Sequence, residues 1–88
     1  MNKDQRKKWY KDTITLNKGL NILIDTTVTD IKGNIGSVVS ITKGVSPEEH
    51  GFIEVKLNNG TLEHYVYFEW YKHLRVITKP QSKPYIDL

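Results

Sequence analysis

The sequence predicts a mostly β domain, folded as a small antiparallel barrel. Two observations favour strands over helices: the 88 residues include no alanine, and Ile, Val, Thr and Tyr are frequent. The third observation is Asn59-Gly60, which lies between two runs of alternating polarity. Asn-Gly is the strongest short signal for a β-hairpin, because both central residues of a type I′ turn need positive φ. A chain of this length makes one domain with a modest core.

The N-terminal segment, residues 1–12, is polar and basic, and it predicts a basic arm or a short helix. Asn2 or Asp4 is suited to cap such a helix. Trp9 either folds back onto the core or stands exposed as a stacking residue. The next four residues, 13–16, alternate in polarity and predict a short strand.

Two further extended segments are expected before the hairpin. The run 20–29 has apolar residues at even positions, and the chain is expected to bend near Asp25 and Asp30. After a Gly-rich loop, residues 35–41 predict a strand, at whose start Gly36 lets the backbone bend or pack closely. The side chains expected to face inward from this strand are Ile35, Val39 and Ile41.

Residues 43–51 predict a loop, because the segment contains Gly44, Pro47 and Gly51. Glu48-Glu49-His50 within it is a weak metal-binding signal, since neighbouring side chains of an extended chain point in opposite directions. We therefore expect neither a metal ion nor another cofactor.

The hairpin register follows from taking Asn59-Gly60 as a two-residue turn. Leu57 then faces Leu62, and Lys56 faces Glu63 as a charge pair. The residues predicted to face the core are Ile53, Val55, Leu57, Leu62, His64 and Val66. The residues predicted on the outer face are Phe52, Glu54, Lys56, Glu63, Tyr65 and Tyr67. The alternation makes register important, because a slip of one residue turns a strand's side chains to the other face.

The chain is expected to finish its fold with a helical turn and a last strand. The aromatic residues 68–73 predict a single helical or 3₁₀ turn, and residues 74–77 predict the strand. The prolines in residues 78–88 predict an extended or disordered tail. The predicted organisation is thus an arm at 1–12, a barrel at 13–77 and a tail at 78–88.

This order of elements resembles the SH3-like small barrels, including KOW-type modules, over about residues 20–77. The residues that carry the resemblance are Val28, Gly33, Gly36, Val38, Val39 and Ile41, the run Ile53–Leu57, and the turn and strand at 68–77. The resemblance implies a binding module, since KOW-type modules mostly bind RNA or protein and other SH3-like barrels dock peptides, cage methylated lysines or join larger assemblies. The RNA-binding members usually have basic loops, whereas loop 43–51 here carries Glu48 and Glu49.

Charge is distributed unevenly along the chain. The net charge is +3, made up of +4 in residues 1–11, −4 in residues 12–71 and +3 in residues 72–88. Basic ends of this kind can bind phosphate. The absence of cysteine excludes disulfides and thiolate chemistry, and no apolar run is long enough for a membrane span. We expect a cytoplasmic protein, and the composition is typical of an AT-rich genome such as that of a phage or a low-GC bacterium.

The leading functional hypothesis is a small accessory or regulatory module that binds nucleic acid or a nucleoprotein. Basic residues at the two ends would hold phosphates, and aromatic residues would stack on bases. The RNA or DNA contacts are expected from Lys3, Arg6, Lys7, Lys8, Trp9, Lys11, Lys72 and Arg75.

The alternative hypothesis is a protein-docking module, such as an inhibitor or a subunit of a larger assembly. Tyr and Trp anchor many interfaces, and the predicted outer face is rich in aromatic residues. The docking residues would be Phe52, Tyr65, Tyr67, Trp70 and Tyr71. The same aromatic residues would instead form a second core layer if the N-terminal segment covers them.

Catalysis is not expected. His50, His64 and His73 are scattered, and no serine or threonine lies beside a His–acid pair in the sequence. The oligomeric state is not predicted.

Overall fold

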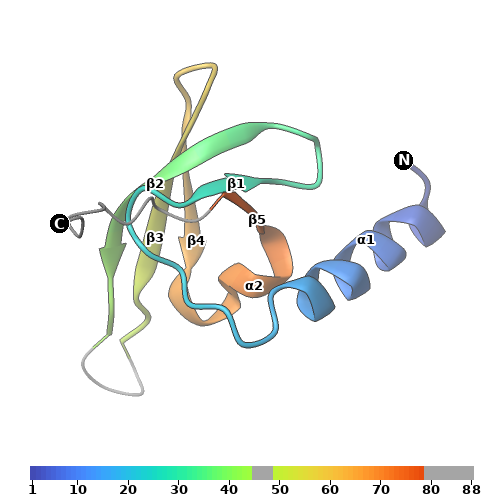
Figure 1. Ribbon diagram of the computed structural model, residues 1–88, viewed down its shortest axis with the longest axis horizontal. Helices are drawn as coiled ribbons and strands as arrows, with labels where there is room; N and C mark the ends of the chain where they lie inside the picture. Colours follow the sequence, from blue (N-terminus) through green and yellow to red (C-terminus); the bar gives the residue numbers. More distant parts are fainter. Residues whose placement is uncertain (45–48, 79–88) are drawn as a thin grey trace, which may run out of the picture.

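The computed structural model describes residues 1–44 and 49–78 as a five-stranded antiparallel sheet with an N-terminal helix and a short helix before the last strand (Figure 1). The elements in chain order are α1 (Lys3–Leu16), β1 (Thr27–Thr29), β2 (Ile35–Thr42), β3 (Phe52–Leu57), β4 (Leu62–Val66), the 3₁₀ turn η1 (Tyr67–Glu69), α2 (Trp70–His73) and β5 (Arg75–Thr78). The fold is therefore a mixed α/β domain rather than a mostly β one.

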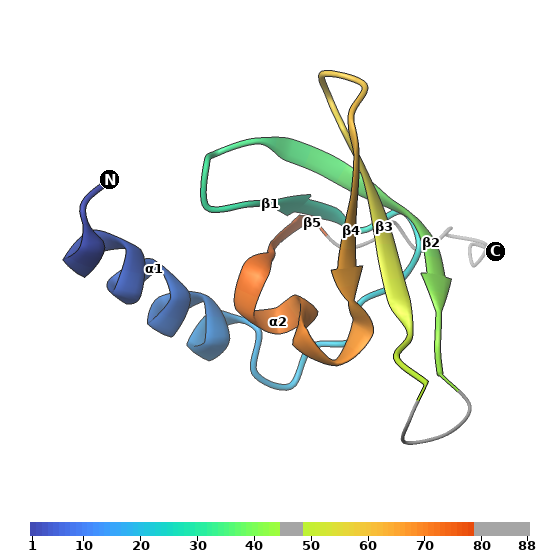
Figure 2. The same cartoon turned by 180° about the vertical axis from the view of Figure 1, so that it is seen from behind.

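The strands are hydrogen-bonded in the order β4-β3-β2-β1-β5. The chain meanders from β1 to β4, and β5 then returns to pair with β1 (Figures 1 and 2). In the described residues β4 and β5 remain the two edges of the sheet, so the sheet is not closed into a barrel. The predicted antiparallel strands, hairpin and helical turn are confirmed, whereas closure is not.

The N-terminal segment is a helix of 14 residues, and the strand predicted at 13–16 is wrong. Asn2 caps α1 as expected: its side chain accepts a hydrogen bond from the Gln5 backbone N–H at 2.8 Å, and the Gln5 side chain accepts from the Asn2 N–H at 2.9 Å. This reciprocal capping box stabilises the first turn. At the other end, Thr13 is fully buried against the sheet, so packing overrides its preference for strands.

The extended run 20–29 contains only one short strand, β1. Its even-numbered side chains Ile22, Thr26 and Val28 are buried, which confirms the predicted parity for these three. The bend at Asp25 is also confirmed, because this residue adopts a positive φ of 75° between Ile24 and Thr26.

Strand β2 contains a bulge between Val38 and Ser40, and the bulge overturns part of the predicted inward face. Val38 is fully buried, while Ile35 and Val39 are exposed; of the three residues predicted to face inward, only Ile41 packs against the core. One extra residue in a strand reverses the alternation beyond it. Gly36 is needed for close packing, since a Cβ there would lie 2.7 Å from the Lys56 carbonyl oxygen.

The β3–β4 hairpin exists, but its register differs by one residue from the prediction. Lys56 pairs with Leu62 and Val55 with Glu63, because residues 58–60 form a three-residue loop closed by hydrogen bonds between Leu57 and both Gly60 and Thr61. Gly60 alone in the loop takes a positive φ, of 92°. This is the three-residue hairpin with a left-handed third position, rather than the two-residue turn.

The slip exchanges the two faces of β4. Tyr65 lies beside Ile53 on the core side, whereas His64 is exposed and its Nε2 lies 2.9 Å from the Glu54 carboxylate on the outer face. The predicted Lys56–Glu63 pair is also wrong, since these side chains lie on opposite faces of the sheet.

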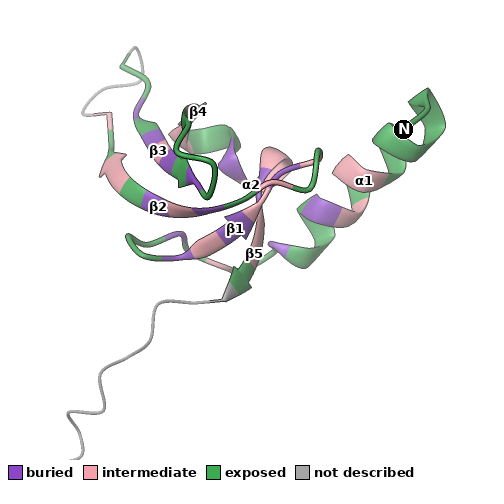
Figure 3. Cartoon of the chain, turned by 90° about the horizontal axis from the view of Figure 1, so that it is seen from above, coloured by how far each residue is buried: buried purple, intermediate pink, exposed green. Residues whose placement is uncertain are grey.

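The core lies between the concave side of the sheet and α2 (Figure 3). Its buried hydrophobic residues are Ile22, Val28, Val38, Ile53, Val55, Leu57, Trp70 and Leu74. Figure 3 also shows that the first turns of α1 are exposed, so this helix projects from the sheet rather than covering it. In the described residues no helix is long and apolar enough to cross a membrane.

Two sequence predictions lie partly or largely outside the described residues. The Glu48-Glu49-His50 metal signal includes one residue that the structure does not describe. Of the predicted tail at 78–88, only Thr78 is described, and it ends β5.

Candidate nucleic-acid interface

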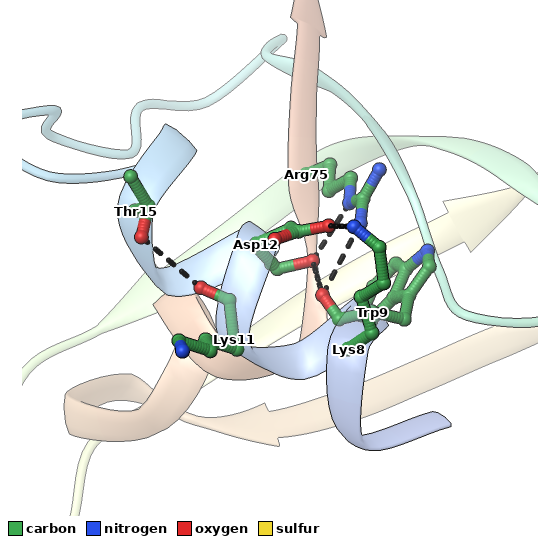
Figure 4. Close-up of polar contacts among 7 residues, drawn as sticks. Lys8, Trp9, Lys11, Asp12, Thr15 and Arg75 are labelled. Carbon is green, nitrogen blue, oxygen red and sulfur yellow. Dashed lines mark hydrogen bonds and ion pairs between the residues drawn. The ribbon is translucent and has the colours of Figure 1, made fainter. Parts of the chain in front are cut away.

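Arg75, at the start of β5, joins α1 to the sheet (Figure 4). Its Nε donates a hydrogen bond to the Thr13 hydroxyl at 2.7 Å, and its Nη2 donates to the Trp9 carbonyl oxygen at 3.2 Å. The guanidinium also lies over the Trp9 ring, 4.5 Å from the ring centroid. These contacts fix the direction in which α1 leaves the sheet.

Asn17 makes the second joint, directly after α1. Its side-chain amide donates to the carbonyl oxygens of Tyr71 at 2.9 Å and Leu74 at 2.6 Å, and the residue is 3% exposed. The two joints hold the C-terminal half of α1 against α2 and β5, while the N-terminal half stays in solvent.

Three residues predicted to bind nucleic acid have partners within the fold. Trp9 and Arg75 contact each other at the joint described above. Lys8 pairs with Asp12 one turn along α1, with Nζ and the carboxylate 3.3 Å apart (Figure 4). Trp9 and Arg75 thus hold α1 against β5. The sequence could not reveal this contact, because the two residues are 66 positions apart.

Three other predicted residues form a row along α1. Lys3, Lys7 and Lys11 are exposed and follow one another at intervals of four positions, so their Cα atoms rise by about 6 Å per step along one side of the helix. None of the three makes an ion pair within the described residues. The row is a line of positive charge on the projecting part of the molecule.

Arg6, the remaining predicted residue of α1, lies on a cleft between this helix and the β1–β2 loop. The cleft has a volume of about 560 Å³. It is lined by Met1, Arg6, Tyr10, Ile31 and Lys32. Arg6 reaches it from α1 and Lys32 from the β1–β2 loop, and within residues 1–44 and 49–78 no carboxylate lines it. In Figure 1, α1 runs below the loop that connects β1 and β2, and these are the elements from which Arg6 and Lys32 come.

Lys72 lies apart from this cleft, on α2, where its Nζ is 5.9 Å from the Tyr71 ring centroid. A separate groove of about 590 Å³ borders the same tyrosine. It is lined by Ile14, Thr15, Asn17, Lys18, Gly19, Leu20, Trp70 and Tyr71. The structure therefore brings together the α1 cations but not all eight predicted residues.

The predicted aromatic docking surface is not assembled. Trp70 is 7% exposed and belongs to the core, while Tyr65, Tyr67 and Tyr71 are half-buried against it. Of the five predicted docking residues, only Phe52 is well exposed, at 49%. Tyr65 is half-buried because the register slip turns it to the core side of β4. Tyr67 is not on the strand, because it begins the 3₁₀ turn η1.

An unforeseen chain of rings runs from α1 into the sheet. Tyr10 contacts Trp9 and the His73 ring edge to face, with centroids 5.5 and 5.8 Å away, and His73 stacks on Tyr65 at 5.9 Å. Burial, and then the charges of Glu63 and Asp30, raise the pKa of Tyr65 to about 12. The rings come from three separate elements, so only the tertiary structure could reveal them.

The position of Lys32 in the cleft could not be predicted from the sequence. Its backbone N–H donates to the Asp30 carboxylate at 2.9 Å, and the Asn34 N–H donates to the same oxygen at 2.9 Å. This tight loop fixes Lys32 opposite Arg6. The only available signal was an aspartate followed by a Gly-rich turn, which predicts a loop but not what the loop faces.

In the described residues no group of three or more His, Asp or Glu side chains is arranged to hold a metal ion. Comparison with protein-family models, with curated proteins and with solved structures found no match. The function must therefore be inferred from the residues of the site.

Proposed function

We propose that this protein is a small, non-enzymatic nucleic-acid-binding module that holds a phosphate backbone in the cleft between α1 and the β1–β2 loop. The observation that carries the proposal is the pair Arg6 and Lys32, which line a cleft that has no carboxylate in its lining among the residues that the structure describes. The row Lys3, Lys7 and Lys11 extends the positive surface along the same helix. Arginine and lysine are the side chains that supply most contacts to phosphate.

The arrangement of strands supports an SH3-like module as the scaffold. The last strand returns to pair with the first, and a helical turn immediately precedes it, as in the family that the sequence resembles. The helix α1 is an addition to that scaffold, and the cleft exists only because α1 is present. Binding would therefore rely on the helix more than on the loops of the sheet.

The fixed position of α1 favours binding as well. The cations of a disordered arm lose conformational freedom when they bind, whereas these are carried by a capped helix that Arg75 and Asn17 already hold in place. The contacts are to the backbone of the ligand, so they provide affinity with little preference for sequence.

The test is a comparison of two double variants that change net charge equally. Arg6→Ala with Lys32→Ala removes the positive charge from both walls of the cleft. We expect it to weaken binding of a labelled single strand of about 12 nucleotides by about tenfold. It should also lower the slope of log affinity against log salt concentration by roughly 1.4, at about 0.7 for each lost contact. Fluorescence anisotropy measures both quantities.

The control is Lys43→Ala with Lys56→Ala, because both lysines lie away from α1 on the sheet and its far loop. This variant should bind nearly as well as the unmodified protein. Equal losses in the two double variants would mean that net charge alone, not the cleft, attracts the nucleic acid.

Protein docking is the second candidate, and the groove beside α2 is the observation that favours it. Ile14, Leu20 and Tyr71 give that groove an apolar lining, and Lys18 adds a positive charge. The candidate surface is therefore not the aromatic sheet face expected from the sequence, but the junction of α1 with α2. A protein partner there would leave the cleft lined by Arg6 and Lys32 unaffected.

A further inference from the structure

A smaller pocket of about 200 Å³, here called the inner pocket, lies beside the cleft. The two cavities are neighbours, because Tyr10, Ile31 and Lys32 line both of them. The residues that line only the inner pocket are Asp30, Glu63, Tyr65 and His73. Four elements meet there: α1, the β1–β2 loop, β4 and α2.

The inner pocket has the aromatic lining that a flat heterocycle needs. Tyr10, Tyr65 and His73 are the rings that line it. His73 stacks on Tyr65 with a centroid separation of 5.9 Å and meets Tyr10 edge to face at 5.8 Å. Unpaired bases bind proteins by stacking on aromatic side chains of this kind, and each base has a face to offer.

The two carboxylates of the pocket differ in their availability. Asp30 is 9% exposed, and its oxygens already accept hydrogen bonds from the Lys32 N–H and from the backbone and side chain of Asn34. Glu63 is half-buried on the core side of β4, and within the described residues no hydrogen bond or ion pair engages its carboxylate. Glu63 is therefore the free acceptor of the pocket.

We propose that the inner pocket takes one unpaired nucleobase that carries an exocyclic amino group, with the Glu63 carboxylate accepting a hydrogen bond from that group. The inference rests on the proposed function, because Arg6 and Lys32 in the neighbouring cleft would hold the phosphate to which this base is attached. An ionised carboxylate accepts but does not donate, so it pairs with the N4 amino group of cytosine and repels the O4 oxygen of uracil. The ligand is thus a single strand with a base turned inward.

The experiment compares oligo(dC) with oligo(dU), because these strands share a backbone and a ring size but differ in the group at C4. The unmodified protein should bind oligo(dC) about tenfold more tightly, and it should bind a duplex of the same length more weakly than oligo(dC). In Glu63→Gln the side-chain amide both donates and accepts, so affinities for oligo(dC) and oligo(dU) should converge.

The matched control is Glu54→Gln, which removes the same charge from the opposite face of the same hairpin. It should keep the preference for oligo(dC). Loss of the preference in both variants would assign it to overall charge and would overturn the inference. Retention of the full preference in Glu63→Gln would do the same.

The measurements on the unmodified protein separate the two proposals even if Glu63→Gln does not fold. Equal binding of oligo(dC) and oligo(dU) would remove the base pocket and leave the phosphate cleft in place. Absence of binding to every strand would remove the proposed function itself. Cytidine monophosphate serves as a further probe, since binding as tight as that of oligo(dC) would point to a free nucleotide and against a strand.

Discussion

At the scale of single residues, the position of Tyr65 in the fold changes its pKa. The residue packs against the core from β4, and burial together with the charges of Glu63 and Asp30 raises its pKa to about 12 from an ordinary value of 10.0. Its ring lines the pocket proposed for a base. The raised pKa makes the stability of the fold depend on pH in the alkaline range.

The direction of this dependence follows from proton binding. Between pH 10 and 12 the folded protein keeps the Tyr65 proton that the unfolded chain has lost, so the free energy of unfolding falls as the pH rises through this window. Tyr65→Phe keeps the ring but has no proton to lose, and its stability should fall less between pH 9 and pH 11. Urea unfolding of both proteins at these two pH values measures the difference; identical losses would contradict the raised pKa.

At the scale of elements, the attachment of α1 to β5 is the contact on which the cleft depends. Arg75 supplies it with two hydrogen bonds and a contact over the Trp9 ring. Without it, only the Asn17 joint would hold α1, and the part of the helix that carries Arg6 and Tyr10 would be less firmly placed. The stability of this joint and the binding of a ligand should therefore change together.

Arg75→Ala is expected to lower the free energy of unfolding by about 2 kcal/mol, because it removes charged hydrogen bonds from a half-buried site. The amides of α1 should also exchange with solvent faster than in the unmodified protein. Hydrogen exchange and urea unfolding test these expectations. Lys56→Ala, on an exposed part of β3, is the control and should change stability little. A stable Arg75→Ala with a protected α1 would show that the joint lies elsewhere.

The elements were more predictable from the sequence than their registers. Alternating polarity and turn residues located β3, β4 and the helical turn, because these signals act over a few neighbouring residues. The hairpin loop and the bulge after Val38 were not predictable in the same way. Asn59-Gly60 favours a two-residue loop, but Gly60 also suits the left-handed last position of a three-residue loop, and this difference of one residue decides which face Tyr65 occupies.

At the scale of the whole molecule, charge could be predicted but the cleft could not. Composition alone indicated a basic N-terminal segment, and Lys3, Lys7 and Lys11 are indeed exposed. Arg6 and Lys32 line the same cleft only when α1 docks beside β5. Sequence patterns describe single elements, whereas a site between elements needs the tertiary contacts that hold them.

The molecule is consequently polarised. Its projecting helix carries unpaired cations, the inner pocket contains carboxylates, and the core lies behind both. A strand bound in the cleft would have its phosphates beside Arg6 and Lys32 and a base beside the aromatic rings of the neighbouring pocket. This arrangement suits a single-stranded nucleic acid.

The most direct test of this account is an amide-shift NMR titration of the full chain with a short single-stranded oligonucleotide, at low and at physiological salt. We predict shifts in residues 3–11, in residues 30–34 and around His73, all of which weaken as salt is added. Absence of shifts even at low salt, or shifts confined to the groove at 14–20 and 70–71, would contradict the central claim. The second outcome would make the groove, and a protein partner, the subject of the next experiment.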